Sequence, residues 1–165
     1  MKKIALLAVL LCVITAFGFA QESYAQNGML IEPGSINANV GLGFGYGYGI
    51  GIGGGVEYAI GKFTIAEKLP FTYGAAGRLG LYLGSDISLA AGAFGTVHFC
   101  WGALNLPSQL AWIGNFDSYL GLGLTFLPNI GINMIGGTNY FISNNLAINV
   151  ETGIKSSYIG VLFKF

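Results

Sequence analysis

The chain ends in the stretch Ile159-Gly160-Val161-Leu162-Phe163-Lys164-Phe165, in which every second residue is large and apolar. Side chains alternate between the two faces of a β-strand, so these apolar residues share one face if the segment is extended. Lys164 falls on the opposite face. A period of two over this length predicts a strand with one apolar face.

The same alternation fills most of the chain. It is longest in 36–52, where large apolar residues alternate first with asparagines and then with glycines. A helix would scatter such a pattern around its circumference. The predicted alternating sets lie within 36–52, 56–60, 71–83, 87–101, 120–126, 130–142, 146–154 and 157–165. Eight is the smallest even number of strands in membrane barrels, so the pattern predicts an all-β, closed antiparallel up-and-down barrel.

Two predicted connections are long, 61–70 and 102–117, and both fall on the side of the two chain ends. Pro107 suits the first turn of a helix, which predicts a short interfacial helix within the second connection. Connections on the other side are expected to be short.

The N-terminus carries Lys2-Lys3, then an apolar run over 4–20, then polar residues. This order is typical of a secretory signal peptide, with cleavage after Ala20 or, alternatively, after Ala25. The expected organisation is a signal peptide over 1–20, a short periplasmic leader over 21–34 and a barrel over 35–165. Only Cys100 survives processing, so no intrachain disulfide is expected.

Composition supports a membrane barrel rather than a soluble domain. Hydrophobic residues make up 53% and charged residues 8% of the chain, against roughly 25% charged in ordinary globular proteins. No uninterrupted apolar stretch beyond the signal is long enough for a membrane helix. Without Lys2 and Lys3, 7 − 2 = 5 basic side chains face 7 acidic ones, a formal charge of −2. No basic patch exists, which excludes a nucleic-acid partner.

Charged residues within the predicted strands fall on the non-apolar face. A basic side chain facing lipid at mid-membrane costs roughly 2–4 kcal/mol, so these charges are expected in the lumen. Buried charge is expensive unless it is paired. The predicted ion-pair network in the lumen consists of Glu57, Arg78, Glu151 and Lys155.

Aromatic residues gather where the apolar face reaches the side of the chain ends. Tyrosine and tryptophan favour the membrane–water boundary. The predicted interfacial girdle consists of Tyr58, Phe71, Tyr73, Phe99, Trp101 and Tyr140.

Three motifs carry little weight. Gly49-x-Gly51-x-x-Gly54 matches a dinucleotide fingerprint, but it lies inside the alternating glycine run and no helix follows it. His98 and Cys100 share the inner face, yet a structural zinc site normally needs four ligands. Hydrolysis needs a nucleophile and an oriented base, and His98 is the one imidazole. No catalytic residue, cofactor or metal is therefore expected.

With its signal-like N-terminus, repeated alternation, the turn Tyr140-Phe141-Ile142-Ser143-Asn144-Asn145-Leu146-Ala147 and the final Phe165, the chain resembles small eight-stranded bacterial outer-membrane β-barrel proteins of the OmpA-like transmembrane-domain type. The resemblance implies location in the outer membrane of a Gram-negative-type envelope, with outer-membrane lipid as a partner. It also implies that Ile159, Val161, Phe163 and Phe165 are read by the barrel-insertion machinery.

The expected function is a structural or interaction role with a lumen filled by side chains. One alternative is a narrow, porin-like pore or a small-ligand carrier, because the glycine-rich inner face leaves space unless neighbouring side chains occupy it. A second alternative is a secreted soluble β-barrel or sandwich. The pattern specifies neither a ligand nor an oligomeric state.

Overall fold

The computed structural model describes residues 23–45, 49–66, 68–104, 106–127, 129–153 and 156–165. The strands are β1 (Ile36–Gly45), β2 (Gly49–Ile65), β3 (Leu69–Leu83), β4 (Ile87–Cys100), β5 (Phe116–Leu127), β6 (Gly131–Ser143), β7 (Leu146–Gly153) and β8 (Ser156–Lys164). Two short 3-10 helices, η1 (Trp101–Leu104) and η2 (Ser108–Asn115), join β4 to β5.

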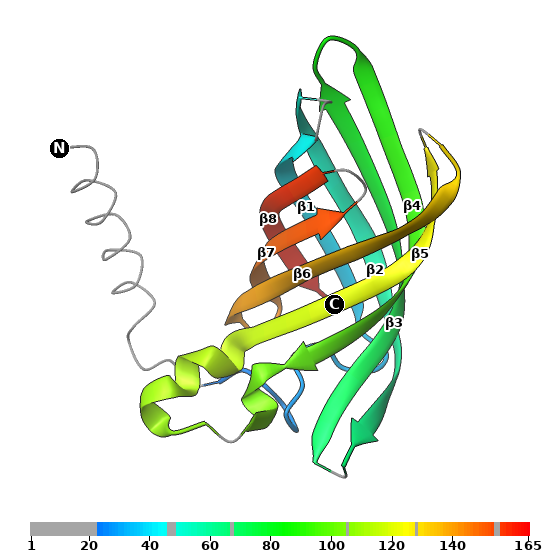
Figure 1. The fold of residues 1–165 in the computed structure, drawn as a ribbon. Helices are drawn as coiled ribbons and strands as arrows, with labels where there is room; N and C mark the ends of the chain where they lie inside the picture. Colours follow the sequence, from blue (N-terminus) through cyan, green and yellow to red (C-terminus); the bar gives the residue numbers. More distant parts are fainter. Residues whose placement is uncertain (1–22, 46–48, 67, 105, 128, 154–155) are drawn as a thin grey trace, which may run out of the picture.

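The eight strands form one closed antiparallel barrel in sequence order, as predicted (Figure 1). Closure occurs between β1 and β8, where Val40 is opposite Val161. At the end of this seam the backbones of Ile36 and Phe165 exchange two hydrogen bonds, of 3.1 and 2.8 Å. A closed barrel has no unpaired strand edge. We call the end of the barrel at which Ile36 and Phe165 pair, and which segment 23–35 covers, the proximal end. The opposite end is the distal end.

None of the helical segments among the described residues is long and apolar enough to cross a membrane.

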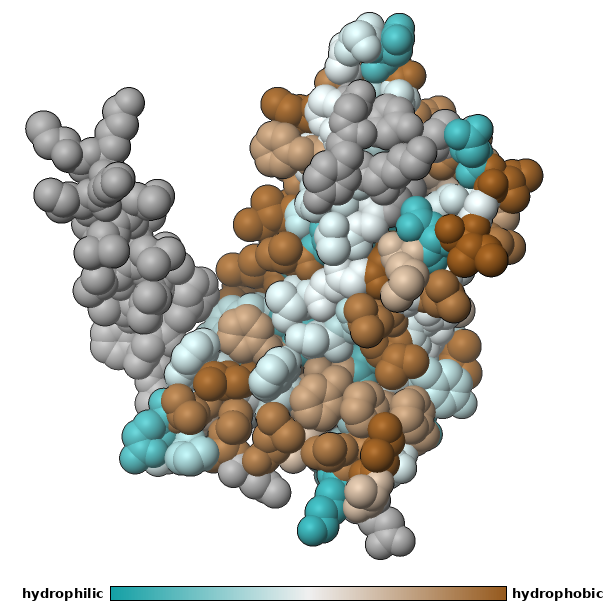
Figure 2. Space-filling view, viewed as in Figure 1, coloured by the Kyte–Doolittle hydropathy of each residue, from teal (hydrophilic) through white to brown (hydrophobic). Residues whose placement is uncertain are grey.

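The two faces of the barrel wall have opposite chemistry. Large apolar side chains project outward and stay exposed along the strands, among them Leu79 (69%), Leu120 (65%) and Ile132 (80%). Inward positions hold buried polar residues, glycines and alanines, together with a few large side chains such as Tyr82, Phe94 and Phe141. The space-filling view shows brown apolar residues along the sides of the visible wall and in its lower part, with a paler band between them (Figure 2). The predicted assignment of the two faces is therefore confirmed for most strands.

The prediction of one long first strand over 36–52 is wrong. β1 ends at Gly45 and β2 begins at Gly49, and the two pair as a hairpin with Phe44 opposite Ile50. Phe44 and Ile50 have even numbers and both face outward. The alternation of apolar residues therefore continues in phase across the turn, and the sequence pattern does not show where β1 ends. Gly49 has φ +89°, a conformation that favours glycine.

The predicted connection 61–70 is also wrong, since β2 runs to Ile65 and β3 begins at Leu69. The pairing of β2 with β3 shifts between Ala59 and Gly61. Such a bulge inserts one residue and reverses which positions face outward. Phe63, opposite Phe71, therefore continues the outer face in odd-numbered positions, whereas the sequence pattern before the bulge used even ones.

The predicted helix after Pro107 is present as η2, although its hydrogen bonding is of the 3-10 type. The connection spans 101–115 rather than the predicted 102–117, because β4 ends at Cys100 and β5 already begins at Phe116. Asp117 consequently belongs to a strand. Its side chain is 2% exposed and faces the interior.

The glycines of β1 and β2 make room for one large side chain. Gly43 and Gly53 face inward, and the ring of Tyr158 on β8 lies over both. A Cβ atom at Gly43 would be 2.5 Å from Cδ1 of Tyr158, and one at Gly53 would collide with the same ring. The glycines of β1 and β2 thus leave the space that the Tyr158 ring occupies.

A matched pair of glycine substitutions tests this packing. We expect Gly53→Val to lower the free energy of unfolding by about 1–3 kcal/mol, as is typical when a packed core is overfilled. Gly77→Val is the control, because Gly77 faces outward and a Cβ there meets nothing within 4 Å. Urea midpoints of the refolded proteins measure both effects. Equal midpoints for the two variants would contradict the placement of Tyr158.

Candidate functional site: the barrel interior

Inward side chains fill the barrel in three layers along its axis. The proximal layer is apolar and consists of Leu30, Ile31, Ala59, Cys100, Phe141, Ala147 and Leu162. The middle layer, here called the polar belt, consists of Glu57, Arg78, Thr96, His98, Asp117, Tyr119, Asn139, Asn149 and Glu151. The distal layer consists of Tyr82, Ala90, Phe94 and Ile135. Tyr119 of the polar belt also contacts this layer, and Tyr158 packs against it.

Arg78 connects two acidic residues in the polar belt. Its Nε donates to both carboxylate oxygens of Glu151, at 3.1 and 2.9 Å. Its Nη2 lies 3.5 Å from Oε2 of Glu57. All three side chains are at most 6% exposed. The structure thus brings together three of the four residues of the predicted lumen network, while Lys155 lies outside the described residues.

His98 extends the network to a third carboxylate. Its Nε2 lies 2.6 Å from Oε1 of Glu57, and its Nδ1 lies 2.7 Å from Oδ2 of Asp117. A carboxylate can only accept hydrogen bonds, so both ring nitrogens must donate unless one acid is protonated. The group Glu57–His98–Asp117 therefore holds one proton more than a neutral imidazole would supply. Thr96 Oγ1 donates to Glu57 as well, at 2.6 Å.

Amide side chains continue the belt toward β7. Asn139 Nδ2 donates to Asp117 Oδ2 at 3.1 Å, and Asn149 Nδ2 donates to Asn139 Oδ1 at 2.7 Å. Tyr119 stacks on His98 with ring centroids 5.0 Å apart and donates its hydroxyl to Glu151 at 2.5 Å. Buried polar groups are costly unless they are hydrogen-bonded. These contacts join the two acidic ends of the belt into one hydrogen-bonded system.

The segment before β1 covers the proximal end of the interior. Leu30 and Ile31 are each 1% exposed. Thr72 Oγ1 donates to the Ile31 carbonyl at 2.7 Å, and Lys164 Nζ donates to the Leu30 carbonyl at 2.9 Å. The predicted leader over 21–34 is thus in part a structural element, which we call the proximal plug (23–35).

A small cavity lies beside the belt on the glycine-rich side. Asn39, Arg78, Asn149, Glu151 and Tyr158 contribute to its lining, together with glycines of β1 and β2. Its volume is about 10 Å³, which corresponds to about one water molecule. The Oδ1 atom of Asn39 is buried and has no hydrogen-bond partner among the described residues. The cavity is therefore large enough for one water molecule and has polar groups in its lining.

His98 and Cys100 do not face the same partners. Cys100 lies in the proximal apolar layer, 3.6 Å from the Gly114 carbonyl, whereas both nitrogens of His98 contact carboxylates. Among the residues that the structure describes, no three His, Cys, Asp or Glu side chains are grouped so that they could hold a metal ion.

Most residues of the predicted aromatic girdle lie on the outer wall at the proximal end. Tyr58, Tyr73 and Trp101 are 40–50% exposed. Phe71 lies between Phe63 and Phe99, with ring centroids 5.4 and 5.1 Å apart. Tyr140 departs from the prediction, since it is 6% exposed.

Tyr140 is buried because η2 and the start of β5 cover it. Phe116 lies 4.8 Å from its ring, and Trp112 of η2 lies 6.0 Å from Phe116. No pattern in the sequence near Tyr140 indicates that a distant connection folds back over this position.

The predicted insertion signal lies on the outer face of β8 and at the residue after it. Its members are exposed to different degrees: Ile159 59%, Val161 37%, Phe163 43% and Phe165 77%. Their recognition by an insertion machinery stays a prediction.

Sequence reasoning missed three parts of the interior. The sequence pattern places Asp117 in a connection, and it does not link Tyr158 to Gly43 and Gly53. It also places the plug residues Leu30 and Ile31 in the leader. A signal existed for Asp117, because continuing the alternation of β5 backward from Tyr119 places it on the inner face.

The comparisons with known proteins concern the fold alone. No protein-family model matches the chain, and no curated protein matches it significantly. A solved structure described as "De novo design of transmembrane beta-barrels" is similar to this chain, with a TM-score of 0.51 and 21% sequence identity. The match covers 83% of this chain and 100% of that chain. The protein is therefore a closed eight-stranded antiparallel β-barrel whose fold is similar to that of a designed transmembrane barrel.

Removal of Arg78 tests the polar belt. We expect Arg78→Met to lower the free energy of unfolding by about 3–5 kcal/mol, because it leaves Glu57 and Glu151 buried without their cation. Lys62→Met is the control: Lys62 is exposed near the tip of the β2–β3 hairpin, and an exposed charge contributes at most about 1 kcal/mol. The double variant Arg78→Met/Glu151→Gln should recover part of the loss. Urea midpoints that fall equally for Arg78→Met and Lys62→Met would contradict the pairing.

Proposed function

We propose that the protein is an integral outer-membrane β-barrel with a structural or interaction role and a filled lumen. The observation that carries the proposal is the inverted distribution of polarity. Arg78, Glu57 and Glu151 are almost completely buried, while large apolar side chains remain exposed around the wall. In a lipid environment both features are favourable. Hydrocarbon covers the exposed apolar side chains, and the charges remain paired inside the barrel.

The soluble alternative fits this arrangement poorly. Monomeric soluble proteins rarely expose contiguous apolar patches beyond a few hundred Å². Here the outward positions of consecutive strands are apolar, for example Leu81 opposite Leu89 and Leu122 opposite Met134. A soluble barrel would bury such residues and expose the polar ones.

The pore alternative has less support than a filled lumen. An eight-stranded barrel is just wide enough for its side chains to fill the interior. Buried aromatic residues of the distal layer, the polar belt and the plug follow one another along the axis. The salt-bridged belt supports the OmpA-like type of barrel, in which charged side chains occupy the lumen.

The contacts of residues 23–25 favour one of the two processing sites. The Tyr24 backbone N–H donates to Asn115 Oδ1 at 2.8 Å, and Ser23 Oγ donates to the Gly114 carbonyl at 3.3 Å. Tyr24 and Ala25 pack against the proximal apolar layer. Cleavage after Ala20 keeps these contacts, whereas cleavage after Ala25 removes them.

Processing can be checked on protein expressed with its N-terminus in a Gram-negative host. We expect the mass of the chain from the membrane fraction to correspond to Gln21–Phe165, the product that retains the contacts of Ser23, Tyr24 and Ala25. A mature chain beginning at Gln26 would contradict this assignment.

Reconstitution tests the proposed location and the filled lumen together. We expect refolded protein to migrate faster in semi-native gels unheated than heated, because a closed barrel stays compact in detergent. In planar bilayers it should give no conductance steps, because the interior is occupied; a wide porin inserted in the same way is the control.

Two other outcomes would favour the alternatives. Discrete conductance steps from heat-modifiable protein would support the narrow pore. Solubility in plain buffer without a mobility shift would contradict the membrane location.

A further inference from the structure

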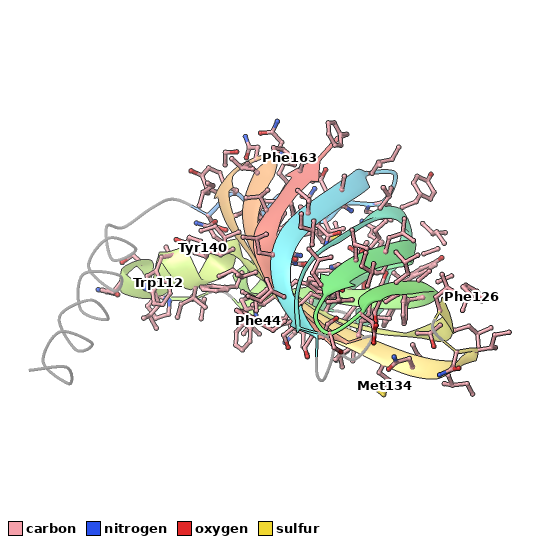
Figure 3. The ribbon with its side chains drawn as sticks, turned by 90° about the horizontal axis from the view of Figure 1, so that it is seen from above. Phe44, Trp112, Phe126, Met134, Tyr140 and Phe163 are labelled. Atoms are coloured by element: carbon pink, nitrogen blue, oxygen red, sulfur yellow. The ribbon has the colours of Figure 1, made fainter. Side chains whose placement is uncertain are left out.

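The connection between β4 and β5 is unlike the others. It spans 101–115, whereas connections at the distal end have two or three residues. It projects sideways from the wall at the proximal end, beyond the outline of the barrel seen from above, and Trp112 lies on the projecting part (Figures 1 and 3). We call residues 101–116 the shelf.

The shelf has the composition of an apolar surface. No charged residue occurs from Trp101 to Phe116 in Trp101-Gly102-Ala103-Leu104-Asn105-Leu106-Pro107-Ser108-Gln109-Leu110-Ala111-Trp112-Ile113-Gly114-Asn115-Phe116. Leu104 and Leu110 are each 41% exposed. An exposed connection in water is normally rich in polar residues, so the shelf is suited to a different medium.

One side of the shelf is fixed to the barrel. Gly114 and Asn115 are buried, and Asn115 accepts the hydrogen bond from the Tyr24 backbone. Trp112, Phe116 and Tyr140 form a continuous series of ring contacts from η2 onto β6. The shelf is therefore held in place, which keeps its other side directed away from the wall.

The shelf continues the aromatic series of the outer wall. Rings of Phe63, Phe71 and Phe99 follow one another across β2, β3 and β4. Phe99 then contacts Trp101 at 6.1 Å, and Trp101 is the first residue of η1. Trp101 Nε1 donates to Ser118 Oγ at 3.0 Å, which fixes the indole against β5. The outer wall and the shelf thus form one apolar surface.

We propose that the shelf lies in the membrane interface at the proximal end and buries Leu104, Leu110 and Trp112 among lipid acyl chains near the headgroups. This inference rests on the proposed membrane location. Amphipathic segments that lie in the plane of the interface bind through buried apolar area and, where they are basic, through anionic lipids. Because the shelf carries no charge, its partner is the acyl-chain boundary, and its binding is independent of anionic lipid and of salt.

The two tryptophans of the chain, Trp101 and Trp112, both belong to the shelf, which permits a direct test. Trp101→Phe leaves Trp112 as the reporter, and Trp112→Phe leaves Trp101 at the edge of the barrel wall. Each variant, spanning Gln21–Phe165, is refolded into phosphatidylcholine vesicles that carry bromine on the acyl chains, either near the glycerol or near the methyl end.

We expect emission of both reporters to be lost more strongly to bromine near the glycerol than to bromine near the methyl end. The emission maximum of Trp112 should be blue-shifted relative to unfolded protein. Neither signal should change when phosphatidylglycerol or salt is added. Leu104→Ser/Leu110→Ser should reduce the loss for Trp112 and leave that for Trp101 unchanged.

Failure of this inference differs from failure of the proposed function. Quenching of Trp101 alone, with Trp112 emitting as in water, would place the shelf outside the lipid while the barrel remains inserted. Dependence of Trp112 quenching on phosphatidylglycerol or salt would overturn the acyl-chain assignment. Absence of quenching for both reporters, with no heat-dependent gel shift, would overturn the membrane location and the inference together.

Discussion

The narrow interior of an eight-stranded barrel is the constraint on which the rest of the structure depends. A barrel of this size encloses little more than its own side chains, so each inward residue must fit its neighbours and each inward charge must find a partner. Arg78 meets this demand by joining Glu57 and Glu151. Tyr158 meets it by lying over inward glycines of β1 and β2. The tyrosine ring fits inside the barrel because these inward positions are glycines.

The polar belt and the apolar wall are consequences of the same period of two. A one-residue slip of any strand would move its charges to the outer face and its apolar residues inward. In a lipid environment such a slip would cost free energy on both faces, because it would place charges against hydrocarbon and apolar residues beside the polar belt. The polar belt therefore has two effects: it stabilises the barrel, and it determines which side chains of each strand point inward. His98, held between Glu57 and Asp117, ties β4 into this arrangement.

Sequence alone predicts those features that depend on local alternation, namely the closed barrel, its two faces and the lumen charges Glu57, Arg78 and Glu151. It fails where the pattern is uninformative or interrupted. The alternation continues in phase across the β1–β2 turn, so the sequence pattern does not reveal this turn. The bulge after Ala59 changes the phase of the alternation, so the end of β2 and the start of β3 are predicted as a connection. Contacts between distant segments, such as the cover of η2 over Tyr140, leave no periodic signal.

We propose that hydrocarbon, rather than water, contacts the outer wall. The most direct measurement is the free energy of unfolding of Leu122→Arg relative to Leu122→Ala in phosphatidylcholine vesicles, since Leu122 lies midway along β5 and is 60% exposed. A lipid-facing arginine near the membrane midplane costs about 2–4 kcal/mol, and we expect Leu122→Arg to lose stability by that amount relative to Leu122→Ala. Equal stability of the two variants would contradict it, because an arginine on a water-facing wall carries no such cost.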